Sequence, residues 1–430
     1  MIRCMRYVPF CAHRAMTLGV LRWLLRPKIR RTPYVPAARR VLYVAASSLP
    51  YHISGYTTRT HELVRAMSAM GVDALALTRP GYPWDRSDRL AEPESETTRV
   101  EDVLYAHDRH PSKRRLAAQY AVQAAPMIMR RAIHARVGCI HAASNHVNAL
   151  PALLAARRLG IPFVYEMRGL WEMTRASRQP GYEDSHDYSL GLELEGLTAQ
   201  HADQVLVISD QLGKYAGRVW NIPADRITLL PNCIDPDRIT PGDPQGVSPG
   251  VIGYAGSLIG YEGLDTLIEA VGILAGQGLD ARLEIIGDGE ARPELERLVA
   301  RRSLTDRVRL RGRAEPEAAR ALLAGCALVC IPRKPFAVCE IVPPIKLVEA
   351  LALAKPVIVP DLPVFHDELG PQPAGFFFRA GDAGDLARVV GRALADPRAL
   401  AELGARGRAY VLQHRQWREH AARALRPVWE

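Results

Sequence analysis

Short apolar runs rich in β-branched residues alternate with longer segments of helical period along most of this chain, which limits its fold more than any other feature. Continuous apolar strands separated by amphipathic helices are typical of parallel sheets that are covered on both faces. Right-handed β-α-β connections between such strands give doubly wound, Rossmann-type α/β domains. The runs expected to form strands are 41–46, 73–78, 138–142, 162–166, 204–208, 227–230, 251–254, 282–286, 308–310, 327–331, 356–359 and 375–378.

A segment rich in proline and glycine, 236–250, divides these strands into two groups and is expected to be an interdomain linker. A chain of 430 residues is long enough for two sizeable cores. We therefore expect two similar domains that face each other across a cleft, each binding a ligand beyond the carboxyl ends of its strands. The expected parts are a basic N-terminal arm (1–40), a first domain (41–235), the linker, a second domain (251–405) and a C-terminal helical segment (406–430).

The formal net charge of +10 is concentrated at the N-terminus, where 11 Lys and Arg residues precede the first acidic residue, Glu62. The rest of the chain has 45 basic and 46 acidic residues, so its composition does not indicate a nucleic-acid-binding surface. Arginines interrupt every apolar core that a secretory signal would need, and the first serine, Ser47, comes too late for a typical transit peptide. Residues 1–40 are therefore expected either to lie on an anionic membrane surface or to be a solvated terminus. The apolar residues of this arm are Leu18, Leu21, Trp23, Leu24 and Leu25.

Other patterns exclude several classes of protein. The longest apolar run, 321–332, is too short to span a bilayer, which needs about 20 residues. Seven dispersed cysteines without CxxC pairing indicate a reducing, cytoplasmic compartment and no thiol metal site. The acidic and histidine residues at 183–187 lie between glycine and proline and favour a solvated loop over a metal cluster. Neither G-x-G-x-x-G nor the P-loop motif occurs, which argues against a dinucleotide oxidoreductase and a P-loop NTPase.

The stretch 331–361 is the most informative for chemistry. Pro343 and Pro344 are tolerated at a helix start, and the first turn of that helix would offer free amides and a positive dipole end to an anion. Lys346 lies in this turn, and a basic pair ends the preceding strand, so three cations could hold a diphosphate: Arg333, Lys334 and Lys346. Glu349 could then accept hydrogen bonds from ribose hydroxyls and Glu340 from a sugar ring. Alternatively, Lys346 and Glu349 form an ordinary i,i+3 surface pair.

Glycines and a long polar loop follow other expected strands. Glycine lets backbone amides approach a ligand closely. The candidates after the strands at 251–254 and 282–286 are Gly256, Ser257, Gly287 and Gly289. The loop 47–56 precedes an amphipathic helix and contains Gly55 and Tyr56.

The segment 340–358 resembles the donor-site motif of glycosyltransferase family 4, which contains retaining enzymes of the GT-B fold. Further segments resemble that family in the same order, so that the resemblance covers the chain from about residue 41 onwards: 54–56, 165–172, 202–209, 230–235, 253–257, 286–289 and 308–312. It implies a GT-B fold with a sugar nucleotide in the C-terminal domain, an acceptor in the N-terminal domain, and a last helix that crosses back to the first domain.

The resemblance also implies roles for single residues. Glu349 would bind the ribose and Glu340 the transferred sugar, while Lys346 and the backbone around Ile341, Pro344 and Ile345 would hold the diphosphate. We expect Glu340, Lys346 and Arg333 to be catalytic and Lys334 to bind the donor. Cations and a helix dipole would then take a metal's place, so no metal or other cofactor is expected.

The chain departs from the family pattern at three places. Eight residues separate Glu340 from Glu349, where seven is common, and Glu262 stands where a lysine is expected. The histidine usual near the cleft is missing at 165–169. The acceptor side is therefore assigned to Gly55, Tyr56, Arg168 and His141, with Glu166, His146 and His52 as alternatives.

Together these patterns predict a cytoplasmic retaining hexosyltransferase that uses a nucleotide-sugar donor and a lipid-linked or glycan acceptor, as in surface-polysaccharide or glycolipid assembly. The basic arm would bring it to the inner face of a membrane. The alternatives are an inverting transferase or a sugar-nucleotide epimerase of the same fold, and a catalytically silent sugar-nucleotide-binding protein. The donor base, the sugar, the acceptor and the oligomeric state stay open.

Overall fold

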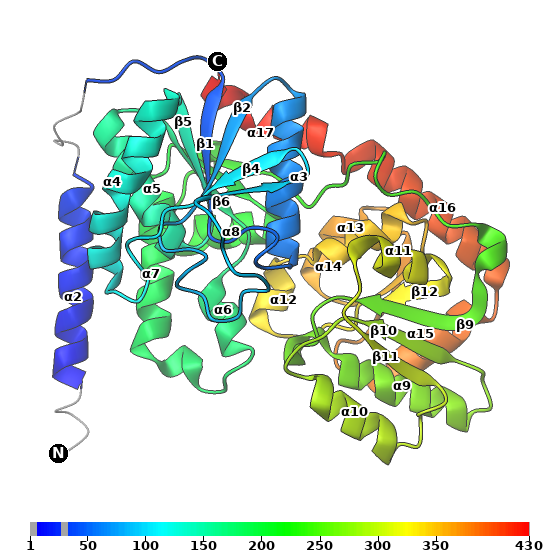
Figure 1. Ribbon diagram of the computed structural model, residues 1–430. Helices are drawn as coiled ribbons and strands as arrows, with labels where there is room; N and C mark the ends of the chain where they lie inside the picture. Colours follow the sequence, from blue (N-terminus) through cyan, green and yellow to red (C-terminus); the bar gives the residue numbers. More distant parts are fainter. Residues whose placement is uncertain (1–6, 27–32, 430) are drawn as a thin grey trace. The chain divides into compact units, whose positions relative to one another are not determined.

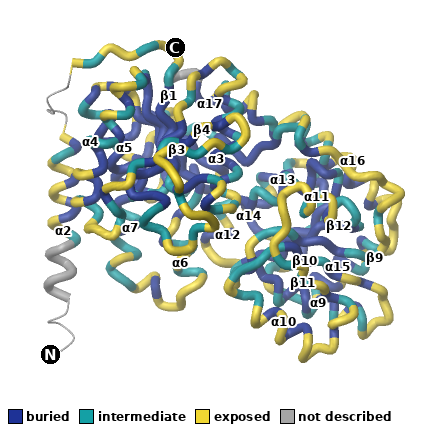
Figure 2. The backbone as a smooth tube through the Cα atoms, in the orientation of Figure 1, coloured by how far each residue is buried: buried dark blue, intermediate teal, exposed yellow. Residues whose placement is uncertain are grey.

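The computed structural model describes residues 7–26 and 33–429, with side chains described for 14–26 and 33–425. Contacts divide the chain into two compact units, Met1–Pro231 with Trp417–Glu430, and Asn232–Gln416. In each unit, helices surround a mainly parallel sheet whose strands are largely buried (Figures 1 and 2). The predicted class, two Rossmann-like α/β domains, is confirmed.

The division between the units falls earlier than the predicted linker. Asn232 donates through Nδ2 to the Pro343 carbonyl at 3.2 Å, and the Ile234 N–H donates to the Arg415 carbonyl at 2.8 Å. These bonds attach 232–234 to the second unit. The expected linker, 236–250, also contains the start of a strand at Ser248.

The first unit contains a sheet with the strand order β3-β4-β2-β1-β5-β6-β7-β8, in which only β3 runs antiparallel to its neighbour. The strands are β1 (Arg40–Ala45), β2 (Asp73–Thr78), β3 (Thr97–Val100), β4 (Val103–Ala106), β5 (Cys139–Ala143), β6 (Phe163–Met167), β7 (Gln204–Val207) and β8 (Ile227–Leu229). The strands β3 and β4 were not predicted from the sequence. Edge strand β3 (Thr-Thr-Arg-Val) contains one apolar residue and no buried one, and the apolar run of β4 is only four residues long.

Serine side chains cap three helices of the first unit, α3, α7 and α8. Ser54 and Thr57 form a capping box at the start of α3, in which each side chain binds the other residue's backbone N–H. Ser209 caps α8 in the simpler way, through one bond to the Leu212 N–H. The helical segments are α2 (Tyr7–Leu24), α3 (Gly55–Ala69), α4 (Ala117–Ala135), α5 (His146–Leu159), α6 (Trp171–Ala176), η1 (Tyr182–Asp184), α7 (His186–His201), α8 (Asp210–Trp220), η2 (Ala224–Arg226) and α17 (Trp417–Trp429).

The described part of the expected N-terminal arm is a docked helix. Helix α2 packs against α4 and α7 (Figure 1). Leu18, Leu21 and Leu25 are buried in this contact, and Arg14 forms an ion pair with Glu193 on α7. Burial of these leucines gives α2 an inner face that belongs to the protein core.

The second unit contains a fully parallel sheet with the order β11-β10-β9-β12-β13-β14. Its strands are β9 (Ser248–Ala255), β10 (Arg282–Ile286), β11 (Val308–Gly312), β12 (Cys326–Cys330), β13 (Val357–Pro360) and β14 (Gly375–Phe378). Its helical segments are η3 (Pro244–Gly246), η4 (Gly260–Glu262), α9 (Leu264–Gly276), α10 (Arg292–Arg301), α11 (Pro316–Ala324), α12 (Ala337–Ile341), α13 (Ile345–Ala352), α14 (Pro363–Leu369), α15 (Ala383–Leu394) and α16 (Pro397–His414).

The C-terminal segment forms two helices, α16 in the second unit and α17 in the first. Helix α17 packs against α3, and the Arg59 guanidinium lies 5.0 Å from the centre of the Trp417 ring. None of the helices in the described part of the chain has the length and apolar character that crossing a membrane requires.

Candidate functional site

Glycines shape the loops that follow β9 and β10 in the second unit. Gly256 has a φ of +150° and Gly287 a φ of +141°, and a Cβ on Gly287 would lie 1.8 Å from the Gly256 carbonyl oxygen. The Gly256 N–H donates to the Ile286 carbonyl at 2.9 Å and fastens the loops to each other. Gly289 lies in the same contact, because its Cβ would be 2.3 Å from the Leu258 carbonyl oxygen. Close loop packing therefore accounts for these glycines independently of any ligand.

Lys346 on α13 extends across these loops. Its Nζ donates to the Tyr254 hydroxyl at 2.7 Å and lies 4.4 Å from the centre of the Tyr254 ring. A Cβ on Gly256 would come within 2.7 Å of Nζ, so only glycine leaves room for the ammonium group. The Tyr254 hydroxyl in turn donates to the carbonyl of Ser257, whose side chain is exposed, at 3.0 Å. Lys346 is thus held at the strand ends by an aromatic residue that the sequence analysis did not identify.

Glu262 forms ion pairs with two of the three predicted cations. Its carboxylate accepts from Lys346 Nζ at 2.8 Å and from an Arg333 guanidinium nitrogen at 2.9 Å. Arg333 also donates to the Val342 carbonyl at 2.8 Å, just before α13. Glu262 itself is only 3% exposed. The expected cluster of free positive charge is therefore a buried triad with a net charge of +1.

The charges of the triad stabilise one another against the cost of burial. Burial would raise the pKa of Glu262, but Arg333 and Lys346 outweigh it and lower that pKa to about 2. The pKa of Lys346 is lowered, because burial destabilises its charged form more than the attraction of Glu262 stabilises it. The pKa of Arg333 is raised, because the attraction of Glu262 exceeds the opposing effect of burial. Glu262 is consequently a carboxylate at every physiological pH.

The other predicted donor residues lie around this triad. Lys334 donates to Asp265 at 2.6 Å, an ion pair at the unit's surface. Glu349 is half-buried on α13. Glu340 is exposed on α12, a separate short helix that precedes α13. Helix α13 starts at Ile345 with Pro344 as its N-cap, as the two prolines predicted, and Ile341 ends α12. The structure brings Arg333 and Lys346 together through Glu262 and pairs Lys334 with Asp265.

In the first unit, Glu166 at the end of β6 is the centre of a buried network. It accepts from Arg59 at 2.8 Å, Arg168 at 2.9 Å and the Tyr43 hydroxyl at 2.7 Å, and it lies 3.1 Å from His141 Nε2. Arg59 and Arg168 hold the pKa of Glu166 well below its ordinary value despite full burial. These contacts pair the charges of the network with one another inside the protein.

The predicted acceptor-side residues differ in how far they are exposed to solvent. Gly55 is exposed at the start of α3, and Tyr56 is half-buried, with its hydroxyl accepting from the Ala46 N–H at 2.9 Å. Arg168 lies 4.6 Å above the Tyr56 ring and donates to Thr60, so little of its side chain is exposed. His141 is fully buried in the sheet, where its ring cannot meet an acceptor in this structure.

A second buried group of ionisable residues lies nearby, and its geometry could hold a metal ion. Ligand atoms of His146, Glu172 and Glu195 lie within 4.8 Å of one another. Glu195 already accepts from the His146 N–H at 2.9 Å and from the Tyr165 hydroxyl. One Glu172 oxygen has no hydrogen-bond partner, and burial raises the pKa of Glu172 to about 7. Hydrogen bonds within the protein therefore satisfy Glu195, while one Glu172 oxygen stays without a partner.

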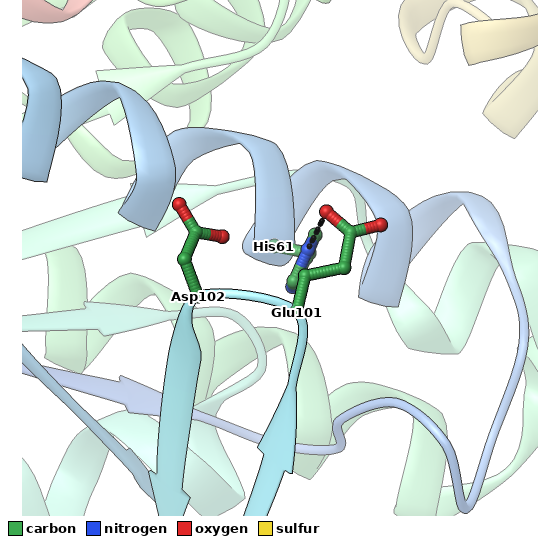
Figure 3. Close-up of side chains that lie close together, drawn as sticks. All are labelled: His61, Glu101 and Asp102. Atoms are coloured by element: carbon green, nitrogen blue, oxygen red, sulfur yellow. Dashed lines mark hydrogen bonds and ion pairs between the residues drawn. The ribbon is translucent and has the colours of Figure 1, made fainter.

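A third group, His61, Glu101 and Asp102, lies between α3 and the β3–β4 turn (Figure 3). His61 Nε2 contacts Glu101 at 3.4 Å, and the Asp102 carboxylate accepts from Arg65 at 2.8 Å. Because Arg65 neutralises the exposed acids, this group is an ion-pair network. The acidic residues at 183–187 lie in η1 and at the start of α7, where Glu183, Asp184 and Asp187 are exposed.

Two residues of these networks were missed in the sequence. Tyr254 lies inside an apolar strand, where nothing distinguishes it from a core residue. Arg59 lies within a helix of mixed polarity, and its burial depends on carbonyl groups of Leu230 and Pro231 far along the chain. Neither role has a local sequence signal.

Comparisons with known proteins agree with this geometry. The family description "Glycosyl transferase 4-like domain" matches residues 54–233, and "Glycosyl transferases group 1" matches residues 244–410. Similar curated proteins include the alpha-D-kanosaminyltransferase of Streptomyces kanamyceticus, 25% identical over 288 residues that cover 63% of this chain and 70% of that protein. The 2-deoxystreptamine glucosyltransferase of the same organism is 25% identical over 276 residues, covering 60% and 68%.

Solved structures share the fold at low sequence identity. Sucrose-phosphate synthase from Thermosynechococcus elongatus has a TM-score of 0.70 and 19% identity, covering 89% of this chain and 97% of that one. HepE from Anabaena, in complex with UDP, has a TM-score of 0.67 and 16% identity, covering 90% and 99%. The fold and the two family matches define a GT-B glycosyltransferase. The chain belongs to the glycosyltransferase family 4-like group.

Proposed function

We propose that this glycosyltransferase moves a hexosyl group from a nucleoside diphosphate sugar to an acceptor hydroxyl with retention of anomeric configuration. The observation that carries the proposal is the triad of Lys346, Glu262 and Arg333 at the carboxyl end of the second sheet. Ligands of doubly wound folds bind at this end of the strands. The UDP and UDP-glucose complexes of the Anabaena protein support a nucleotide-sugar donor.

Lys346 and Arg333 would stabilise the diphosphate as it leaves. Lys346 uses two of its three N–H donors, on Tyr254 and Glu262, so the third can bind a phosphate oxygen without a rearrangement. Preorganised donors aimed at developing negative charge lower the barrier of such a transfer. Backbone near the start of α13 would add the positive end of its dipole.

The glutamates would orient the rest of the donor. Glu349 follows Lys346 by one turn of α13, a position suited to the ribose hydroxyls. Glu340 is exposed on α12 and would accept hydrogen bonds from the transferred sugar. The acceptor oxygen would attack the face that the diphosphate leaves, which gives retention without a protein nucleophile.

The first unit would hold a lipid-linked or glycan acceptor of polysaccharide or glycolipid assembly, in the cytoplasm at a membrane surface. A cavity of about 80 Å³ between α4 and α5 has Lys113 and Arg115 in its lining, and these two side chains would attract an anionic group of the acceptor.

Two experiments test this function. A thermal-shift screen of UDP-, GDP- and ADP-sugars should give one class that raises the melting temperature, because a ligand of the folded state stabilises it. NMR of the product from that donor should then show the donor's anomeric configuration. An inverted product, or turnover without any acceptor, would contradict the proposal.

A catalytically silent sugar-nucleotide-binding protein is a second candidate, favoured by Glu262. Its carboxylate neutralises part of the charge that a leaving diphosphate needs. This candidate predicts nucleotide binding with no transfer to any acceptor and no hydrolysis of the donor.

A further inference from the structure

The outward side of helix α2 exposes apolar residues that the fold does not cover. Met16, Val20 and Trp23 are 59%, 41% and 64% exposed. Their spacing of four and three residues places them along one stripe of the helix. The inner side of the same helix is buried through Leu18 and Leu21. Helix α2 is therefore packed against the first unit through one side, and its apolar stripe on the other side stays exposed.

The chain segments that form α2, α4 and α5 contain no acidic residue. No Asp or Glu precedes Glu62, and none occurs from residue 109 to residue 165, a range that contains α4 and α5. Helix α4 lies alongside α2 in the first unit (Figure 1). The exposed arginines of α2, α4 and their flanking residues form no ion pair with any residue that the structure describes; they are Arg22, Arg26, Arg114, Arg115, Arg130 and Arg136.

Two acidic groups that contact this layer are paired with its arginines. Glu193 on α7 forms an ion pair with Arg14, and Asp108 forms one with Arg131 at 2.8 Å. Val122 and Ile133 on α4, and Leu116 just before it, are also exposed. The combined surface of α2 and α4, which we call the α2–α4 face, is thus apolar and positively charged.

We propose that the α2–α4 face binds the anionic phospholipid surface of a membrane, with Trp23 and Met16 inserted at the level of the headgroups. Tryptophan is favoured at this interface, and unpaired arginines are attracted to anionic lipids. In this proposal, α2 contacts the membrane while it stays packed in the folded first unit. The proposal rests on the membrane location in the proposed function and names the face and the lipid class behind it, but it does not depend on transfer chemistry.

The test is flotation of the full-length protein with vesicles of phosphatidylcholine containing 30% phosphatidylglycerol, at low salt, compared with pure phosphatidylcholine. We expect binding to the anionic vesicles at least tenfold above the neutral ones. Arg22→Glu with Arg26→Glu should lower it at least tenfold, and Met16→Glu with Trp23→Glu by a similar factor. Val219→Glu, an equally exposed apolar position on α8, should change it less than twofold.

All substituted side chains are exposed, so the melting temperature and the nucleotide-induced thermal shift should stay as in the wild type. The proposal is overturned if the wild type ignores lipid charge, or if both double variants bind as it does. It is also overturned if the wild type is a dimer that Trp23→Glu dissociates, because the face would then be an interface between copies. Loss of donor binding with intact vesicle binding would contradict the proposed function alone.

Discussion

Replacing Glu262 by glutamine tests the interpretation of the triad most directly. The substitution keeps the shape and one acceptor oxygen but removes the negative charge that Arg333 and Lys346 share. The structure lowers the pKa of Glu262 from 4.5 to about 2. At 1.36 kcal/mol per unit, this corresponds to about 3 kcal/mol of stability from the charged form. Removing one partner of a buried ion pair has a similar cost, about 3–5 kcal/mol.

The loss should appear as a lower melting temperature of the second unit, Asn232–Gln416. For a domain of this size, about 3 kcal/mol corresponds to a fall of roughly 6–12 °C. Because the folded-state pKa is lowered, the contribution is complete above pH 4.5 and is lost only as the pH falls towards 2. The difference between wild type and variant should therefore be constant from pH 6 to pH 8.

Nucleotide affinity should change in the opposite direction. Without Glu262, the diphosphate meets a net charge of +2 instead of +1, which at an effective dielectric constant near 20 is worth about 1–2 kcal/mol. We expect UDP, or whichever nucleotide binds, to bind about tenfold more tightly by calorimetry. Glu269→Gln is the control, because this half-buried carboxylate pairs with the exposed Arg302 at the surface and should change stability by less than about 1 kcal/mol. If stability and affinity both fall, Glu262 positions Lys346 for the ligand and the charge argument is wrong.

Three further predictions follow from the same contacts. Lys346→Ala should lower donor binding and transfer at least tenfold, whereas Arg302→Ala, which breaks an exposed surface pair with Glu269, should change them less than threefold in the same assay. Glu172→Gln should raise the melting temperature of the first unit at pH 8 but hardly at pH 5. Burial raises the pKa of Glu172 to about 7. The free energy of unfolding of the wild type therefore falls as the pH rises from 4.5 through 7, because the buried carboxyl must ionise, and glutamine avoids this loss. Arg59→Met should lower the free energy of unfolding of the first unit by about 3–5 kcal/mol in urea titrations, since Glu166 loses a buried partner; an unchanged midpoint would contradict this.

The parallel strands and the start of α13 could be predicted because they depend on local signals. Apolar runs identify buried strands, and Pro343 with Pro344 identifies a helix start. The strands β3 and β4 were not predicted, because β3 has only one apolar residue and the apolar run of β4 is four residues long with its side chains alternately buried and more exposed. In the sequence, Glu262 was recognised only as a departure from the lysine that the family pattern has at this position. The fold shows that it is the counter-ion of Arg333 and Lys346. Contacts between residues far apart in sequence leave no periodic signal.

The two buried carboxylates of this protein differ in a way that bears on function. Glu166 accepts from two arginines and a tyrosine, and one of those arginines is further fixed by the Leu230 and Pro231 carbonyls. The charges of this network are paired with one another inside the fold, which suits a structural role. At Glu262, by contrast, Lys346 keeps 14% of its side chain exposed and one donor unused, next to loops that only glycine allows to approach. An anion can reach this second network without unfolding anything, which is why we place the leaving diphosphate at Lys346 and not at Arg168.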